Sequence, residues 1–137
     1  MLMENTSPHE ERRFARDSIT DFQGIAQGIL DAAEESCGVE ALERDLERAL
    51  AVLQRNADLR PQFETELISL IDSIREGVVE LVSFVMHELR WQAVEEGIRS
   101  RISDPRANVS DLRLYEAMLD AFSDSWRDRD LYVRFDR

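Results

Sequence analysis

Apolar residues recur at steps of three and four along almost the whole chain, and sustained alternation of apolar and polar residues is nearly absent. The first spacing places side chains on one face of an α-helix, whereas alternation would place them on one face of a β-strand. Only five glycines and three prolines occur in 137 residues, which leaves little room for long loops. The sequence therefore predicts an all-α fold, a compact bundle or short array of about six helices in antiparallel hairpins.

Caps and helix breakers give the predicted boundaries of these helices. The run Ser7-Pro8-His9-Glu10 has the order of a capping box with proline at the first helical position. Gly38 is expected to stop the first helix, Pro61 to open the third, and Gly77 to divide the third helix from the fourth. Three further breaks are expected, at Arg90–Trp91, at Asp104–Pro105, and at Asn108 or Ser110.

The segment VVELVSFVMHEL, residues 78–89, is the most apolar in the chain. It is apolar nearly all round its helical circumference, which is typical of a helix contacted on several sides. We therefore place the centre of the core there. His87 is expected at the edge of this core and not in a di-iron site, because Phe84 stands where a Glu-x-x-His ligand pair would need a glutamate.

The stretch DAFSDSWRDRDLYVRF, residues 120–135, mixes large apolar side chains with charged ones after the sixth helical stripe. Burying one such apolar side chain stabilises a fold by about 1.5 to 3 kcal/mol. We therefore expect residues 124–137 to form a tail docked on the core. The residues expected to be buried are Trp126, Leu131, Val133 and Phe135, and those expected in solvent are Arg127, Asp128, Arg129 and Asp130.

The chain length fits one domain, because a chain of this size buries about two thirds of its unfolded surface. Residues 1–137 are predicted to form a single helical domain, with residues 1–7 as a candidate disordered segment. No run approaches the roughly 18 to 20 apolar residues that span a bilayer, and the first residues lack the apolar core of a signal peptide. We expect a cytoplasmic protein.

Residue counts exclude several kinds of chemistry. All 17 basic residues are arginine, so the chain has no P-loop lysine, no Schiff-base lysine and no anchor for pyridoxal phosphate. Cys37 is the only cysteine, which excludes an intramolecular disulfide, and it is expected to be a small buried residue. With two histidines and one cysteine, a zinc site would need carboxylates in a spacing that the sequence lacks. No metal or cofactor is predicted.

No catalytic motif stands out, and the sequence favours a protein that is not an enzyme. One catalytic alternative stays open, because magnesium-dependent nucleotide hydrolases gather four carboxylates between helices. The residues that suit this alternative are Asp31, Glu34, Glu35, Asp72, Glu76 and Glu80.

The formal net charge of -12 is the strongest indication about partners. Nucleic acid and anionic membranes would both be repelled, so neither is expected as a partner, and a basic protein is favoured. From Asp31 to Glu47 there are seven acidic residues against Arg44 alone. This run is either a binding surface or an ordinary solvated helix face. The candidate partner-binding residues are Glu34, Glu35, Glu40, Glu43 and Glu47.

Two segments resemble parts of small acidic helical proteins of bacteria, namely VVELVSFVMHELRW, residues 78–91, and DAFSDSWRDRDLY, residues 120–132. Some proteins of this type accompany polymorphic toxins as immunity proteins. The resemblance implies an acidic helical surface that occupies the phosphate-binding cleft of a basic, nuclease-type toxin, and it carries no catalytic residues. The alternative is a non-catalytic scaffold or regulatory helical interaction module. The oligomeric state is left open.

Overall fold

The computed structural model describes residues 8–35 and 38–135, with side-chain packing described from Arg16 onward except at Val39. The expectations for residues 1–7 and for Cys37 lie outside the described residues. The described residues form six α-helices: α1 (Pro8–Glu34), α2 (Val39–Arg55), α3 (Arg60–Asp72), α4 (Glu76–Leu89), α5 (Gln92–Ile102) and α6 (Val109–Asp120). Three short 3-10 helices accompany them: η1 (Ala57–Leu59), η2 (Arg127–Leu131) and η3 (Val133–Phe135). The described residues form no strand, so the predicted all-α class is confirmed.

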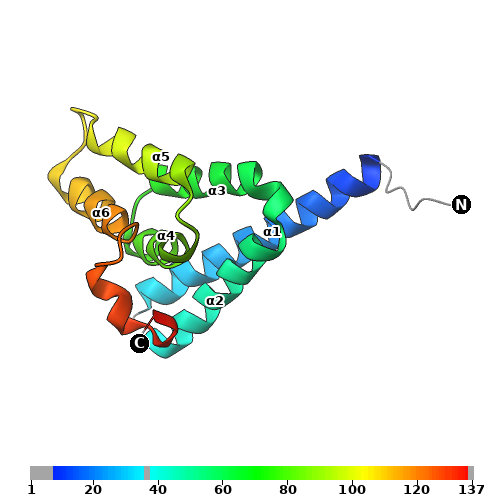
Figure 1. The fold of residues 1–137 in the computed structure, drawn as a ribbon, viewed down its shortest axis with the longest axis horizontal. Coiled ribbons are helices and arrows are strands. Elements are labelled where there is room, and N and C mark those ends of the chain that lie inside the picture. The colour runs from blue at the N-terminus through cyan, green and yellow to red at the C-terminus, as the bar shows by residue number, and fades with distance from the viewer. Residues whose placement is uncertain (1–7, 36–37, 136–137) are drawn as a thin grey trace, which may run out of the picture.

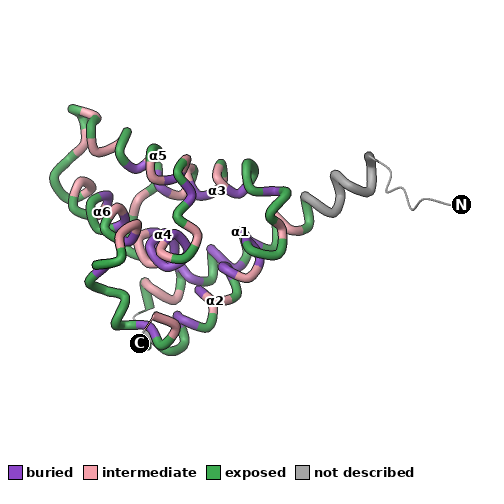
Figure 2. Tube along the Cα trace, viewed as in Figure 1, coloured by how far each residue is buried: buried purple, intermediate pink, exposed green. Residues whose placement is uncertain are grey.

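Helix α4 lies at the centre of the fold and packs against α1, α2, α3 and α6 (Figure 1). Figure 2 shows the buried residues gathered on α4 and on the sides of the other helices that face it. The prediction of a central helix is confirmed, because an apolar surface on every side needs neighbours on every side. The buried residues of α4 are Gly77, Val78, Leu81, Val82, Ser83, Phe84, Val85 and Met86.

The outer helices cover α4 in packed pairs. Helices α1 and α2 pack against each other antiparallel, and Ser18 near the start of α1 donates a hydrogen bond of 3.2 Å to Asn56 just after α2. Helix α5 packs against both α3 and α6. The first turns of α1 project beyond the rest of the fold (Figure 1). None of the described helices is long and apolar enough to cross a membrane.

Two predicted boundaries were wrong, and both involved glycines. Gly38 has φ -63° and ψ 154°, so it is the extended N-cap of α2 and not a left-handed stop for α1. Gly77 lies inside the first turn of α4, and the break between α3 and α4 falls at residues 73–75. The other breaks agree with the sequence: Pro61 lies in the first turn of α3, and the Asn108 side chain caps α6 by accepting from the Asp111 backbone N–H at 2.8 Å.

Gly77 is needed because α4 and α1 approach each other closely. A Cβ at this position would lie 2.8 Å from Leu30 Cδ2 and 3.0 Å from the Leu30 Cα, so backbone as well as side chain would have to move. By contrast, a Cβ at Gly24 or Gly28, in the middle of α1, would meet nothing within 4 Å. The contact at Gly77 is therefore a tertiary requirement, whereas Gly24 and Gly28 weaken α1 without a packing reason inside this chain.

We predict opposite effects of alanine at these glycines. Gly77→Ala should lower the free energy of unfolding by about 1 to 3 kcal/mol, because it overpacks the contact with Leu30. Gly24→Ala and Gly28→Ala should each raise it by about 0.5 to 1 kcal/mol, because helix interiors favour alanine. Urea denaturation of the three variants checks this. A neutral Gly77→Ala variant would contradict the close approach of α4 to α1.

Candidate functional site

The tail after α6 is docked on the core, as predicted. Trp126 is 4% exposed and Tyr132 is 2% exposed. Phe135 is half-buried and packs against the same core. The four charged residues from Arg127 to Asp130 are all exposed, which the sequence also predicted. The tail thus covers part of the core.

The prediction that Leu131 and Val133 are buried was wrong, since they are 54% and 79% exposed. The 3-10 turns η2 and η3 direct Tyr132 inward and its two neighbours outward. Tyr132 was not among the residues predicted to be buried, and a buried tyrosine hydroxyl needs a hydrogen-bond partner. That partner is Glu80 of α4, which accepts a hydrogen bond from the Tyr132 hydroxyl. Only the fold reveals this pairing, because the two residues are far apart in the sequence.

An aromatic cluster fixes the tail on α4. The Phe84 ring lies 5.1 Å from the rings of both Tyr132 and Phe135. The His87 ring packs between Trp126, at 4.9 Å, and Phe135, at 4.8 Å. His87 is half-buried at the edge of the core, where the sequence placed it.

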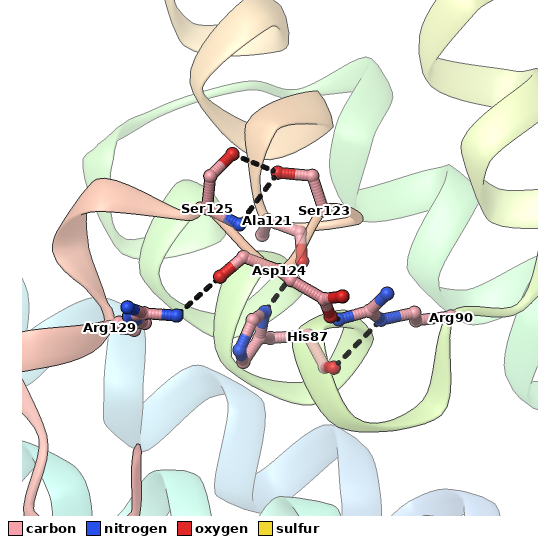
Figure 3. A network of polar contacts seen from close by, with 7 residues as sticks. All are labelled: His87, Arg90, Ala121, Ser123, Asp124, Ser125 and Arg129. Atoms are coloured by element: carbon pink, nitrogen blue, oxygen red, sulfur yellow. Dashed lines mark hydrogen bonds and ion pairs between the residues drawn. The ribbon is translucent and has the colours of Figure 1, made fainter. Parts of the chain in front are cut away.

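Polar contacts tie the end of α4 to the loop after α6 (Figure 3). His87 Nδ1 lies 2.8 Å from the Ala121 carbonyl oxygen, and because a carbonyl only accepts, Nδ1 carries the hydrogen. Arg90, which ends α4 with φ 50°, donates to the Asp124 carboxylate at 2.7 Å and lowers the pKa of that carboxyl. Arg129 donates to the Asp124 carbonyl. The loop is therefore held by α4 and by the tail.

Glu43 of α2 binds the other end of the tail. Its carboxylate is 9% exposed and accepts the backbone N–H groups of Val133 and Arg134, each at 3.0 Å. These N–H groups belong to the start of η3, where a helical turn provides no internal acceptor. The Arg134 guanidinium donates to Glu47 at 2.8 Å and to Glu88 at 3.0 Å. The acids of α2 and α4 thus hold a basic part of the tail.

The five acids predicted to bind a partner occupy three different settings. Glu43 and Glu47 hold the tail, as described above. Glu34 forms an ion pair with Arg75 at 2.6 Å. Glu35 and Glu40 are exposed and form no ion pair within the part of the chain that the structure describes. The structure therefore does not bring the five together in one open patch.

Burial under the tail changes the acidity of Glu80 and Tyr132. Desolvation raises the pKa of Glu80 above its ordinary 4.5; the hydrogen bond from Tyr132 opposes this shift, and the charges of Asp128 and Glu76 add to it. Burial, followed by the bond to Glu80, raises the pKa of Tyr132 far above its ordinary value. The Tyr132 hydroxyl therefore stays protonated and is a permanent donor to Glu80.

Three of the six carboxylates proposed for a magnesium-dependent hydrolase are engaged elsewhere. Asp72 pairs with Arg101 at 2.7 Å, Glu34 pairs with Arg75, and Glu80 accepts from Tyr132. Among the described residues, no three histidine, cysteine, aspartate or glutamate side chains are arranged to hold a metal ion. The geometry of the described chain gives the hydrolase hypothesis no support.

A surface pocket of about 440 Å³ lies beside the tail and is lined by His87, Glu88, Arg129, Arg134 and Phe135. Both of its arginines already bond to groups of this chain, Arg134 to two carboxylates and Arg129 to a backbone carbonyl. Their charge is therefore used to fix the tail. This arrangement suits structural anchoring better than ligand chemistry.

We predict that Glu43 anchors the tail. Glu43→Ala should lower the free energy of unfolding by about 2 to 3 kcal/mol, because two backbone N–H groups lose a charged acceptor. Glu40→Ala, on the same helix but exposed, should change it by less than about 0.5 kcal/mol. Urea denaturation followed by tryptophan fluorescence measures both. Equal effects of the two substitutions would show that the tail does not depend on Glu43.

We also predict a pH-dependent contribution from Glu80. Because its pKa is higher in the folded than in the unfolded state, the folded state binds more protons between the two values, and stability falls as pH rises through that window. Glu80→Gln removes this loss, so its stability relative to the parent should increase as pH rises above about 4.5. Denaturation curves between about pH 4 and 8 measure the difference, and parallel pH profiles would contradict it. Tyr132→Phe should raise the pKa of Glu80 in the folded state further, because it removes the hydrogen bond that lowers this pKa. The fall in stability with rising pH should then continue to a higher pH than in the parent.

Comparison with known proteins assigns no family to this arrangement. Neither a scan against protein-family models nor searches of curated proteins and of solved structures returned a match. The resemblance of residues 78–91 and 120–132 to immunity-type proteins therefore stays an expectation from the sequence. The surfaces that the fold leaves exposed are therefore the basis for proposing a function.

Proposed function

We propose that this protein is a non-catalytic binding module for a basic protein partner, and that in its most specific form it is an immunity protein that neutralises a nuclease-type toxin. The supporting observation is an acidic surface that the fold leaves open. This surface, called here the acidic face of α1, consists of Asp21, Asp31 and Glu35. Glu40 at the start of α2 extends it.

The acidic face of α1 follows the helix for about four turns. Residues 21, 24, 28, 31 and 35 succeed one another at steps of three and four, so they share one side of α1, and all five are exposed. No described arginine forms an ion pair with Asp21, Asp31 or Glu35, and Asp31 accepts only from the Gln27 side-chain amide, at 3.0 Å. The face therefore keeps its negative charge.

Two physical effects make such a face suitable for a basic partner. Opposite fields raise association rates by orders of magnitude at low ionic strength. Exposed carboxylates also present negative charge, which a cleft built to bind phosphates attracts. The net charge of -12 strengthens the first effect over the whole molecule. A scaffold or regulatory module would use the same face, with a basic partner other than a toxin.

The proposal predicts that the position of the acids matters more than their number. A fourfold variant with Asp21→Asn, Asp31→Asn, Glu35→Gln and Glu40→Gln should associate about tenfold or more slowly with a basic toxin domain at low salt. A control with Asp58→Asn, Glu96→Gln, Glu116→Gln and Asp120→Asn changes the net charge equally at exposed sites elsewhere and should associate almost like the parent.

The biological test is growth rescue. The product of the gene that neighbours this protein's gene is expressed with the parent, the fourfold variant or the control variant. We expect rescue by the parent and the control, and weaker rescue by the fourfold variant. A neighbouring gene product that is not toxic, or toxicity that the parent does not relieve, would contradict the immunity form of the proposal.

A further inference from the structure

Helices α1 and α3 leave a groove between them. Two adjoining cavities, of about 180 and 540 Å³, share Gln27, Leu30 and Leu70 as lining residues, so they form one continuous depression. It extends from Phe22 and Glu66 at one end to Arg75 at the other. Along α1 the lining residues run from Phe22 to Leu30, which corresponds to about 12 Å, or just over two helical turns, at 1.5 Å per residue.

The floor of the groove is apolar. Ala26 and Leu30 of α1 and Val78 of α4 are buried beneath it, while Leu70 of α3 and Ile74 are half-buried and present apolar surface to it. An open apolar surface of this kind favours the burial of apolar side chains from another molecule. The Gln23–Glu66 hydrogen bond joins α1 to α3 at one end of the groove, and the larger cavity lies toward Arg75 at the other end.

The rim of the groove is acidic. Three carboxylates beside it are bonded to neutral amides and not to arginines: Glu66 accepts from Gln23 at 2.8 Å, Asp31 from Gln27 at 3.0 Å, and Asp111 from Asn108 at 3.2 Å. The two other charges in the lining are already balanced, since Arg75 pairs with Glu34 and Asp72 pairs with Arg101. The uncompensated charge around the groove is therefore negative.

The surface of α1 beside this rim carries two glycines, which project no side chain toward a partner. Gly24 precedes Gln27 by three residues, and Gly28 precedes Asp31 by three, so each glycine neighbours a rim residue on the helix surface. A Cβ at either glycine would meet nothing within 4 Å. A partner can therefore approach the backbone of α1 closely at these positions.

We propose that the groove between α1 and α3 binds an amphipathic helix from the partner, with about two turns in contact, apolar on one side and flanked by arginine or lysine. A helix suits a groove walled by two helices, because its apolar anchors recur at steps of three and four along the floor. Its cations meet Glu66 on one rim, Asp31 on the other and Asp111 at the end. This inference rests on the proposed function and names the site and the chemistry of the partner segment.

The test uses two synthetic helical peptides of fourteen residues with the same leucine face. One carries arginine on both flanks and the other carries glutamate. Binding to the full-length protein is measured by fluorescence anisotropy at low and physiological salt, and the site is located by amide chemical-shift changes. We expect the arginine peptide to bind, with shifts concentrated at residues 23–30 and 66–75, and the glutamate peptide not to bind.

Matched variants separate the groove from the general charge of the protein. Glu66→Gln with Asp31→Asn should weaken binding of the arginine peptide about tenfold at low salt, since exposed charge pairs each contribute a few-fold. Glu96→Gln with Asp120→Asn is the control, because it removes the same two charges at exposed sites elsewhere. Glu96 on α5 also accepts from a glutamine amide, that of Gln92 at 3.0 Å. Ser69→Trp should obstruct the groove and abolish binding, whereas Ser100→Trp, at an exposed site on α5, should not.

Each other outcome overturns the inference. Equal binding of both peptides would remove the role of the acidic rim, and absence of binding would remove the groove as a helix site. Binding of the arginine peptide that is insensitive to Ser69→Trp and shifts residues around Glu35 and Glu40 would also overturn the groove. That last result would leave the proposed function standing, and growth rescue tests the function independently.

Discussion

The burial of α4 is the constraint on which the rest of the structure depends. A fourteen-residue helix that is apolar nearly all round cannot lie on a surface, so it must be covered from several directions. Helices α1, α2, α3 and α6 pack against α4, and the tail packs over Phe84 and His87. The close contact at Gly77 sets how near α1 comes to α4, and the placement of the outer helices follows from it.

Covering the last side of α4 requires burial of charge as well as of apolar surface. Glu43 lies under the tail because the backbone of η3 needs an acceptor there, and Glu80 lies under it because the Tyr132 hydroxyl needs one. Each carboxylate loses hydration and regains hydrogen bonds, a balance that favours folding only when both partners are present. A charged tail of 3-10 turns is thereby held on the core.

The use of acids under the tail decides which acids can serve a partner. Glu43, Glu47 and Glu88 are engaged with the tail, and Glu34 is engaged with Arg75. Of the five acids that the sequence emphasised, only Glu35 and Glu40 are exposed without an ion pair among the described residues. What stays open is the acidic face of α1 and the groove that it borders. Both proposals therefore rest on carboxylates whose partners are neutral amides or solvent, because only these retain charge for another molecule.

The sequence alone determined the helical class, the central position of α4 and the docking of the tail. These depend on periodicity and on the cost of exposing large apolar side chains, which are local properties of Val78–Leu89 and of Trp126. The tertiary structure alone decided that Gly77 serves a contact, that Tyr132 is buried in place of Leu131 and Val133, and that Glu43 is an anchor. Each of these depends on a residue distant in sequence, Leu30, Glu80 or Val133, and no local pattern specifies such a neighbour.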